Sequence, residues 1–416
     1  MLSGAETTGR PRHIVVVGAS LAGLRTAEAL RQAGYDGALT VVGEETHLPY
    51  NRPPLTKAAL VDGPDLSTLA LPTRADLDTT WILGVTVTAL DITRREVSLE
   101  TGEHLPFDGL VIATGARARR LTKAVALADV HHIRTVDDAT ALHHALAQPD
   151  QSVLVIGAGF LGSEVASTAA ALGHRVTLVE ATAGPMLAAL GPELSAYCAH
   201  LHRGRWVDLR TTTDVLSLSP TRGRRCTSVA VLKHHVDDKR SEVRADIVVA
   251  AVGATPNTGW LHHSGLAIEA GVATDDSLTV LDGTGMPVSG VVAVGDVAQV
   301  PQPLLDGVRS RVEHWAVAVG HARIAAATLL GERPETGAVL PSFWTDQHGV
   351  RIRGLGLPGA GDTTTLVDGA LEDHHFVATR MRRGRLVGAV SVNNAPALIG
   401  YRAELASASM SPRPTR

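Results

Sequence analysis

The sequence predicts an α/β protein that contains two strand–helix–strand units and ends in an α+β domain. Three features favour this: short runs of Val, Ile and Leu, glycine-rich turns after two of these runs, and a change to alternating strands after about residue 325. Uninterrupted apolar runs are typical of strands buried on both faces, as in a parallel sheet covered by helices. A length of 416 residues is enough for about three domains.

The first unit begins with a strand over His13–Val17, followed by a helix over Leu21–Ala33 and a strand over Thr40–Val42. Its turn, GASLAG at residues 18–23, is a variant of GxGxxG in which a serine replaces the second glycine. In that motif the first glycine allows a tight turn, a small second residue lets the backbone approach a pyrophosphate, and the last glycine allows close helix–strand packing. The helix N-terminus supplies unpaired N–H groups for the phosphates. The turn therefore predicts a Rossmann-like, dinucleotide-binding domain.

The second unit repeats this order about 139 residues later, with strands over Val153–Ile156 and Arg175–Val179 and a helix over Gly162–Leu172. Its turn, GAGFLG at residues 157–162, has all three glycines. Because both turns stand between a strand and a helix, we expect two dinucleotide-binding domains.

Each unit also has a candidate acid at the end of its second strand, where a carboxylate bonds the ribose hydroxyls of adenosine. This acid is Glu180 in the second unit, and Glu44, with Glu45 as the alternative, in the first. A solvated acid at a strand end is also common on any protein surface, but the position favours the binding role.

The remaining runs complete the sheets and the last domain. Further buried strands are expected at Leu110–Ala113, Ile247–Val252 and Val291–Val294. After residue 325, alternating antiparallel strands are expected at Val350–Leu355, His375–Arg380 and Leu386–Val392. A third GxGxxG match, at residues 354–359, contains a proline that forbids a helix, so no cofactor is expected there.

Composition excludes several classes of protein. Apolar residues make up 44% of the chain, and 38 basic against 42 acidic side chains argue against nucleic-acid binding through bulk charge. The two cysteines, Cys198 and Cys226, are too few for a disulfide scaffold and are not spaced as CxxC, and the histidines lack the spacing of a metal site. No apolar run reaches the roughly 18 residues of a membrane span. We expect a cytoplasmic protein with no metal and no nucleic-acid or membrane partner.

Six short motifs, in a fixed order, carry a resemblance to a known family: PYNRPPLTK (49–57), ATG (113–115), VGATPN (252–257), VGD (294–296), VEHW (312–315) and FWTDQ (343–347). Over about residues 12–404 the chain resembles FAD-dependent, NADH-dependent ferredoxin reductases of the putidaredoxin reductase and rhodocoxin reductase type. Those proteins serve haem-thiolate monooxygenases and Rieske-type oxygenases. They lie in the pyridine nucleotide-disulfide oxidoreductase superfamily but lack its redox cysteine pair. This chain likewise has no cysteine near residues 52–57.

The resemblance implies a discontinuous FAD-binding domain (residues 1–116 and 246–325), an NAD-binding domain (117–245) and a C-terminal α+β domain (326–416) that covers the flavin. The implied FAD-binding residues are Gly18, Ser20, Ala22, Gly23, Glu44, Arg52, Lys57, Val87, Thr114, Gly115, Arg134, Asp296 and Trp315. The implied NAD-binding residues are Gly157, Gly159, Leu161, Gly162, Glu164, Glu180 and Gly253.

Lys57, Glu164 and Trp315 are the implied catalytic residues. Lys57 would pair with Glu164 and hold a positive charge beside the flavin, which favours the anionic reduced ring. The alternatives are a surface lysine, an acid that only complements its helix dipole, and a core tryptophan. His314 is also expected near the flavin, and Val317 departs from a frequent asparagine of the family.

The resemblance implies that NADH gives a hydride to FAD and that single electrons then pass to an iron–sulfur ferredoxin. Clustered arginines at residues 117–120, 309–311, 351–353 and 380–383 suggest either solubility or a basic rim that docks an acidic ferredoxin. Two alternatives stay open: a flavin disulfide or peroxide reductase, and an NADH-responsive flavoprotein of the apoptosis-inducing-factor type.

Overall fold

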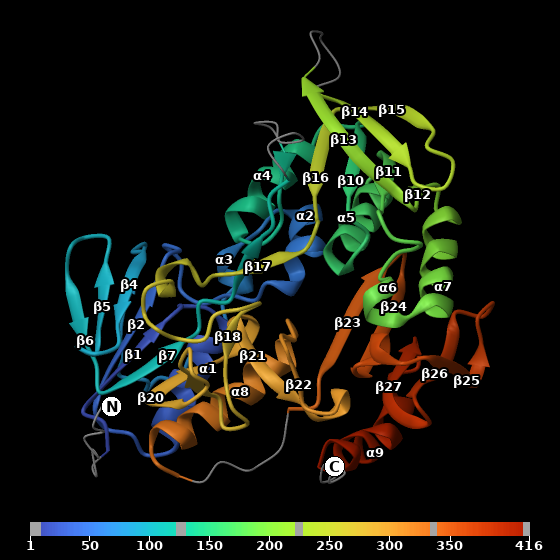
Figure 1. Cartoon of the computed structure of the whole chain (residues 1–416). Coiled ribbons are helices and arrows are strands. Elements are labelled where there is room, and N and C mark those ends of the chain that lie inside the picture. The colour runs from blue at the N-terminus through green and yellow to red at the C-terminus, as the bar shows by residue number, and fades with distance from the viewer. Residues whose placement is uncertain (1–9, 122–129, 221–227, 333–338, 411–416) are drawn as a thin grey trace.

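The computed structural model describes residues 10–121, 130–220, 228–332 and 339–410. Figure 1 shows a first sheet with its helices at the lower left, a second sheet above it, and a C-terminal sheet at the lower right. Cys226 lies outside the described residues.

The first sheet has six strands in the order β19-β20-β7-β1-β2-β3. All neighbours are parallel except β19 and β20. The strands are β1 (His13–Val17), β2 (Ala38–Gly43), β3 (Thr80–Leu83), β7 (Gly109–Ile112), β19 (Thr279–Leu281) and β20 (Pro287–Ala293). Helices α1 (Leu21–Gln32) and α8 (Trp315–Leu329) pack against each other beside this sheet. A small antiparallel sheet adds to the same core: β4 (Val87–Asp91), β5 (Glu96–Leu99) and β6 (His104–Pro106).

The second sheet is parallel throughout, in the order β12-β11-β10-β16-β9. Its strands are β9 (Val130–His131), β10 (Ser152–Ile156), β11 (Arg175–Val179), β12 (Asp208–Arg210) and β16 (Ile247–Ala250). The helices of this part are α4 (Val136–Leu146), α5 (Phe160–Ala171), α6 (Leu187–Leu190) and α7 (Pro192–Arg203). An antiparallel sheet lies beyond it: β13 (Thr213–Pro220), β14 (Ser228–His234) and β15 (Arg240–Ala245).

The C-terminal sheet is antiparallel, in the order β23-β24-β27-β26-β25. Its strands are β23 (Ser342–Gln347), β24 (Val350–Gly356), β25 (Thr363–Ala370), β26 (His375–Arg382) and β27 (Arg385–Val392). Helix α9 (Ile399–Met410) packs against β27. The residues that alternate inward on β23, Phe343, Thr345 and Gln347, are buried.

The chain passes between the first and second sheets through two short strands, β8 (Ala116–Ala118) and β17 (Ala254–Pro256), which pair antiparallel. Smaller elements complete the described structure. They are α2 (Ala58–Asp62), α3 (Leu66–Leu69), β18 (Val272–Ala273), β21 (Ala298–Gln302), β22 (Val308–Ser310) and the 3-10 turns η1 (Pro53–Thr56), η2 (Gly259–Leu261), η3 (Gly295–Val297), η4 (Pro303–Leu305), η5 (Pro358–Ala360) and η6 (Ala395–Leu398).

The predicted α/β fold class, with two Rossmann-like units and a C-terminal α+β domain, is confirmed. One boundary needs correction: β16 pairs with β10, so residues 247–250 belong to the second sheet. The chain therefore returns to the first domain at the β17 crossover, later than the expected residue 246. The third GxGxxG match runs along β24 into η5 and starts no α-helix, as Pro358 predicts.

Candidate active site

A cavity of about 1530 Å³ lies where the three parts of the chain meet. Its walls come from the carboxyl ends of β1 and β2, from the first turn of α5, from the start of α8 and from β23. Ligands of open α/β sheets bind outside the carboxyl ends of the strands. The cavity is therefore the candidate site for a bound cofactor.

The first glycine turn forms one wall of this cavity. Gly18 has a φ of +121°, and a Cβ there would lie 2.2 Å from the carbonyl oxygen of Ala113. A Cβ on Gly23 would lie 2.0 Å from the carbonyl oxygen of Gly18. Ser20 precedes α1 and its side chain does not cap the helix, so N–H groups of the first turn stay available to a ligand. Gly18 and Ser20 line the cavity, whereas Gly23 only allows close packing.

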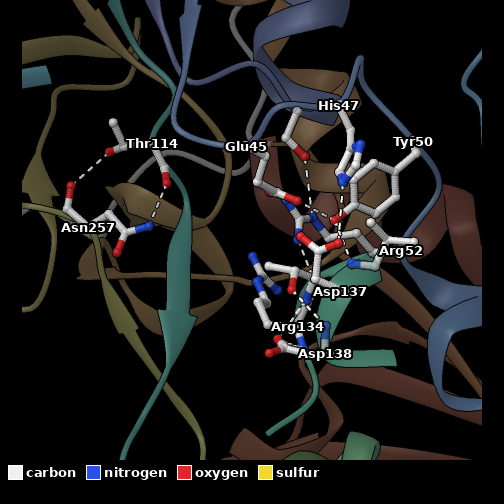
Figure 2. A network of polar contacts seen from close by, with 12 residues as sticks. Glu45, His47, Tyr50, Arg52, Thr114, Arg134, Asp137, Asp138 and Asn257 are labelled. Atoms are coloured by element: carbon white, nitrogen blue, oxygen red, sulfur yellow. Dashed lines mark hydrogen bonds and ion pairs between the residues drawn. The ribbon is translucent and has the colours of Figure 1, made fainter. Parts of the chain in front are cut away.

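The two adjacent acids after β2 have different surroundings. Glu45 accepts a hydrogen bond of 2.5 Å from the Tyr50 hydroxyl and pairs at 2.5 Å with Arg52 (Figure 2). Glu44 lines the cavity, is exposed, and makes no hydrogen bond or ion pair with any described residue. Of the two acids, Glu44 is the carboxylate without a partner in the described chain, and its binding to a ribose stays a prediction. Glu45 holds Tyr50 and Arg52 beside it.

Arg52, Arg134 and Asp296 form a connected group on the same side of the cavity (Figure 2 shows the two arginines). Arg52 donates to the carbonyl oxygen of Arg134 at 2.6 Å, and Arg134 pairs with Asp296 at 2.7 Å. Thr114 and Asn257 are joined by reciprocal side-chain to backbone hydrogen bonds of 2.8 and 2.9 Å. These contacts fix the walls of the cavity where the two crossovers leave the first domain.

Lys57 and Glu164 come together across 107 residues of sequence. The Lys57 Nζ lies 2.7 Å from Glu164 Oε2, and Glu164 is only 4% exposed. The same carboxylate accepts hydrogen bonds from the hydroxyls of Thr56 at 2.5 Å and Thr345 at 2.7 Å, and from the Asp346 N–H at 3.3 Å. A buried carboxylate needs such partners, because an unpaired charge in the interior is costly. The alternative of a surface lysine does not describe Lys57.

Helix α8 begins at Trp315, with His314 as its N-cap residue. Both line the cavity, and Trp315 is 38% exposed. Burial lowers the pKa of His314 to about 4, so its ring is neutral at pH 7. The His314 Nδ1 is buried without a hydrogen-bond partner among the described residues. Val317 is buried away from the cavity, so its departure from the family does not alter the cavity wall.

Sequence reasoning missed Trp344, which also lines the cavity and is 38% exposed. It lies on β23 in the FWTDQ motif, whose alternation places Trp344 on the opposite face from Phe343 and Thr345. That alternation was the available signal. Trp260, on η2, is a second tryptophan of the cavity wall that the motifs did not single out.

The second glycine turn is open. Cβ atoms on Gly157 and Gly162 would lie 2.4 and 1.9 Å from backbone carbonyl oxygens, but nothing lies within 4 Å of one on Gly159. Gly253 is also unobstructed, at a φ of +94°. Among the predicted NAD-binding residues, Leu161 and Glu164 line the cavity, and the others lie outside it.

Glu180 lies at the end of β11, next to this open turn. Its carboxylate accepts hydrogen bonds from the backbone N–H groups of Ala158 at 2.7 Å and Thr182 at 2.8 Å, and from the Thr182 hydroxyl at 2.8 Å. Glu180 therefore shapes the glycine turn as well as offering remaining lone pairs to a ligand.

The residues present fit FAD. Of the thirteen predicted FAD contacts, all except Gly23 line the cavity: Gly18, Ser20, Ala22, Glu44, Arg52, Lys57, Val87, Thr114, Gly115, Arg134, Asp296 and Trp315. The unpaired nitrogen of His314 at the cavity wall is a further polar group for which the described chain supplies no partner. The phosphates would meet the α1 N-terminus, and the ring would lie toward Lys57 and Trp315.

Cys198, the cysteine within the described ranges, does not line this cavity. Cys198 lies on α7, and burial raises its pKa to about 12. No cluster of three or more metal-ligating side chains occurs in the described part of the chain. None of the helices within the described ranges is long and apolar enough to cross a membrane.

The arginines of the predicted clusters differ in their surroundings. Arg117, Arg120 and Arg311 line the cavity. Arg380, in contrast, is 1% exposed and pairs at 3.0 Å with Glu193 of α7. The hypothesis that Arg380 belongs to a surface rim is wrong, because its guanidinium joins the C-terminal sheet to the second domain.

Comparison with known proteins agrees with this architecture. Residues 12–322 match the family described as pyridine nucleotide-disulphide oxidoreductase, and residues 342–415 match a reductase C-terminal domain. The chain is 35% identical to rhodocoxin reductase of Rhodococcus erythropolis, over 91% of this chain and 86% of that protein. It is also 35% identical to the ferredoxin–NAD(+) reductase component of the anthranilate 1,2-dioxygenase system of Burkholderia cepacia, over 91% and 90% of the two chains.

A solved structure extends the comparison to three dimensions. The structure of the covalent putidaredoxin reductase–putidaredoxin complex matches with a TM-score of 0.86 at 30% identity, over 95% of this chain and 93% of that chain. The resemblance predicted from the six motifs is confirmed. The chain belongs to the pyridine nucleotide-disulphide oxidoreductase family.

Proposed function

We propose that the protein is an FAD-dependent NADH:ferredoxin oxidoreductase that supplies electrons to a haem-thiolate monooxygenase or a Rieske-type oxygenase. The observation that carries the proposal is the pair of Lys57 with the buried Glu164 in the wall of the cavity, at a site without a thiol pair. Bound FAD would supply the conversion of a two-electron donor into two one-electron steps. Because the reaction draws on NADH, we assign it to the cytoplasm.

The chain's own residues bind and orient the two nucleotides. The α1 N-terminus and Arg52 would meet the phosphates of the resident dinucleotide, and Glu44 its ribose. NADH would lie on the open turn at Gly159, with Glu180 at its adenosine end. Leu161 and Glu164 follow this turn and line the cavity, which supports a path whose nicotinamide end would lie at the cavity.

Lys57 would hold its positive charge beside the bound flavin, where negative charge develops when the hydride is accepted. Glu164 neutralises this lysine in the resting site and fixes its position, so the ammonium does not move away into solvent. Charges that a protein holds in a fixed orientation act more strongly on a reacting group than mobile charges in water do. Lys57 therefore favours acceptance of the hydride.

Electrons would leave through the open side of the cavity. Trp315 and Trp344 line the cavity and are each 38% exposed. Arg117 and Arg120 also lie in its walls and are exposed, whereas Arg311 is paired with Glu313 at 2.8 Å. Arginines around an exit favour an acidic partner through electrostatic steering, despite the net charge of −4. An iron–sulfur ferredoxin is such a partner.

The test is anaerobic mixing of the yellow holoprotein with NADH, followed by a ferredoxin. Bleaching of the flavin by NADH and its rapid return on addition of the ferredoxin are expected. Turnover with a disulfide or peroxide instead would favour the reductase alternative. A reduced, long-lived complex that does not pass electrons to ferredoxins would favour the sensor type.

A further inference from the structure

The FWTDQ motif contains two buried polar residues that do not line the cavity. Its inward residues, Thr345 and Gln347, are fully buried on β23 and do not line the cavity. Buried polar side chains are retained where they have hydrogen-bond partners. Their partners outside the C-terminal domain are Glu164 and Met186, which both lie in the second domain.

The hydrogen bonds have a defined direction. The Gln347 amide donates to the Thr345 hydroxyl oxygen at 3.2 Å and contacts the Met186 sulfur at 2.9 Å. A hydroxyl that accepts from an amide has one proton left to donate. That proton goes to Glu164 Oε1, at 2.7 Å.

The two oxygens of Glu164 are therefore held from different sides. Oε2 pairs with Lys57 and accepts a hydrogen bond from Thr56, both of the first domain. Oε1 accepts hydrogen bonds from the Thr345 hydroxyl and the Asp346 N–H of the C-terminal domain. Glu164 itself stands on α5 of the second domain. Hydrogen bonds to a charged acceptor are roughly twice as strong as neutral ones, so these donors restrict the rotation of the carboxylate.

We propose that Thr345, oriented by Gln347, is a positioning residue for the electron-accepting site. It fixes the Glu164 carboxylate and, through it, the Lys57 ammonium in the cavity wall. The C-terminal domain thereby acts on the flavin site through a residue that does not touch the flavin. The inference rests on the proposed function, because it gives Lys57 a role toward bound FAD.

The experiment compares Thr345→Val, which removes the hydroxyl, with Thr345→Ser, which keeps it. Thr379→Val is the matched control, because Thr379 is buried in the same sheet and does not line the cavity. Two quantities are measured on the FAD-loaded proteins: the reduction potential of the flavin and the rate of its reduction by NADH. We expect Thr345→Val to lower the potential and to slow reduction about threefold or more. Thr345→Ser and the control should match the unmodified protein.

A double-mutant cycle with Lys57→Met separates positioning from general damage. If Thr345 acts through Lys57, Thr345→Val should have no further effect on the potential in the Lys57→Met background. Equal shifts in both backgrounds, or an equal effect of the control, would overturn the proposal. Should Thr345→Val fail to fold, Gln347→Met keeps the hydroxyl and removes the amide that orients it. An unchanged potential in Gln347→Met would then overturn the proposal.

Failure of the proposed function would be visible separately, in the unmodified protein. If the unmodified protein binds no FAD, or if NADH does not reduce its bound FAD, the proposed function itself is contradicted before any variant is compared. A chain that is reduced normally but shows no effect of Thr345→Val fails only the positioning proposal.

Discussion

The two glycine turns share a motif but differ in what surrounds them. The first lies in the wall of the large cavity, and the second lies mostly outside it. The acid beside the first turn, Glu44, has no partner among the described residues, whereas Glu180 beside the second accepts hydrogen bonds from its own loop. A nucleotide that stays benefits from an enclosed site, and one that enters and leaves in each turnover needs an open, preformed one. We therefore expect the same fingerprint to serve a resident cofactor at the first turn and a passing substrate at the second.

The largest expected effect tests the enclosed turn. Gly18→Ala should abolish FAD binding, because its Cβ would lie 2.2 Å from the Ala113 carbonyl oxygen at a φ of +121°. Gly159→Ala should leave FAD bound and the fold intact, because nothing in the protein lies within 4 Å of its Cβ. Flavin absorbance of the purified variants distinguishes them. Equal loss of flavin from both would break the comparison.

The next effect lies where the two units meet. Lys57→Met should slow reduction by NADH about 100-fold, the size expected when one oriented charge is removed from a reacting site. It also leaves the buried Glu164 without its cation. Adding Glu164→Gln should therefore cost less than the single changes together, as measured by stopped-flow mixing. Fully additive effects would mean that the two residues act independently.

A tenfold effect is expected at the open turn. NADH should be preferred over NADPH at least tenfold in kcat/KM, because the extra phosphate would face Glu180. At about 4 Å, a pair of unit charges costs on the order of 1 kcal/mol in water and about 4 at an effective dielectric of 20. Two such pairs exceed the roughly 1.4 kcal/mol of a tenfold ratio.

Glu180→Ala should narrow this ratio, chiefly by weakening NADH. Because Glu180 also holds the Ala158 N–H, part of that loss should come from a looser turn. Equal use of both nucleotides by the unmodified protein would contradict the role assigned to Glu180.

The smallest expected effect is a pH dependence of stability that arises where the second domain contacts the C-terminal domain. His202 of α7 is fully buried and lies 2.9 Å from His348, and burial lowers its pKa to about 3. In the unfolded chain the His202 imidazole is protonated below about pH 6.5, whereas in the folded chain it stays neutral at that pH. The free energy of unfolding therefore falls as the pH drops below about 6.5. Between pH 7.5 and 6.0 this linkage costs about 0.8 kcal/mol.

Urea unfolding at the two pH values would measure this loss. Between these two pH values, the free energy of unfolding of His202→Asn should fall by about 0.8 kcal/mol less than that of the unmodified protein. His200→Asn, an exposed change on the same helix, should behave like the unmodified protein. A variant of His202 with unchanged pH dependence would contradict the assignment.

The sequence predicted the strands of the Rossmann units well because a buried parallel strand is a local signal. The strands His13–Val17 and Arg175–Val179 were predicted to the residue. The boundary at residue 246 was wrong because strand pairing is not local: Ile247–Ala250 continues directly from β15 but pairs with β10.

The site was predicted from motifs, which name residues but not their neighbours. The Lys57–Glu164 pair came from the resemblance. The hydrogen bond from Thr345 to Glu164, by contrast, spans 181 residues, and the contact of Gln347 with Met186 spans 161, and neither has a sequence pattern of its own. Arg380 was misjudged for a related reason. A cluster of arginines in sequence cannot show which one is drawn inward by a carboxylate of another domain, here Glu193.

The paired crossovers β8 and β17 bear on how such a chain could arise and be re-engineered. Ala118 lies directly opposite Ala254, so the intervening segment departs and returns at the same point of the structure. A module whose ends adjoin can be gained, lost or exchanged without rebuilding its host, as with domain insertions generally. If Glu180 sets the nucleotide preference, replacing the segment between these two strands with one of another preference should change the electron donor and leave the electron-accepting partner unchanged.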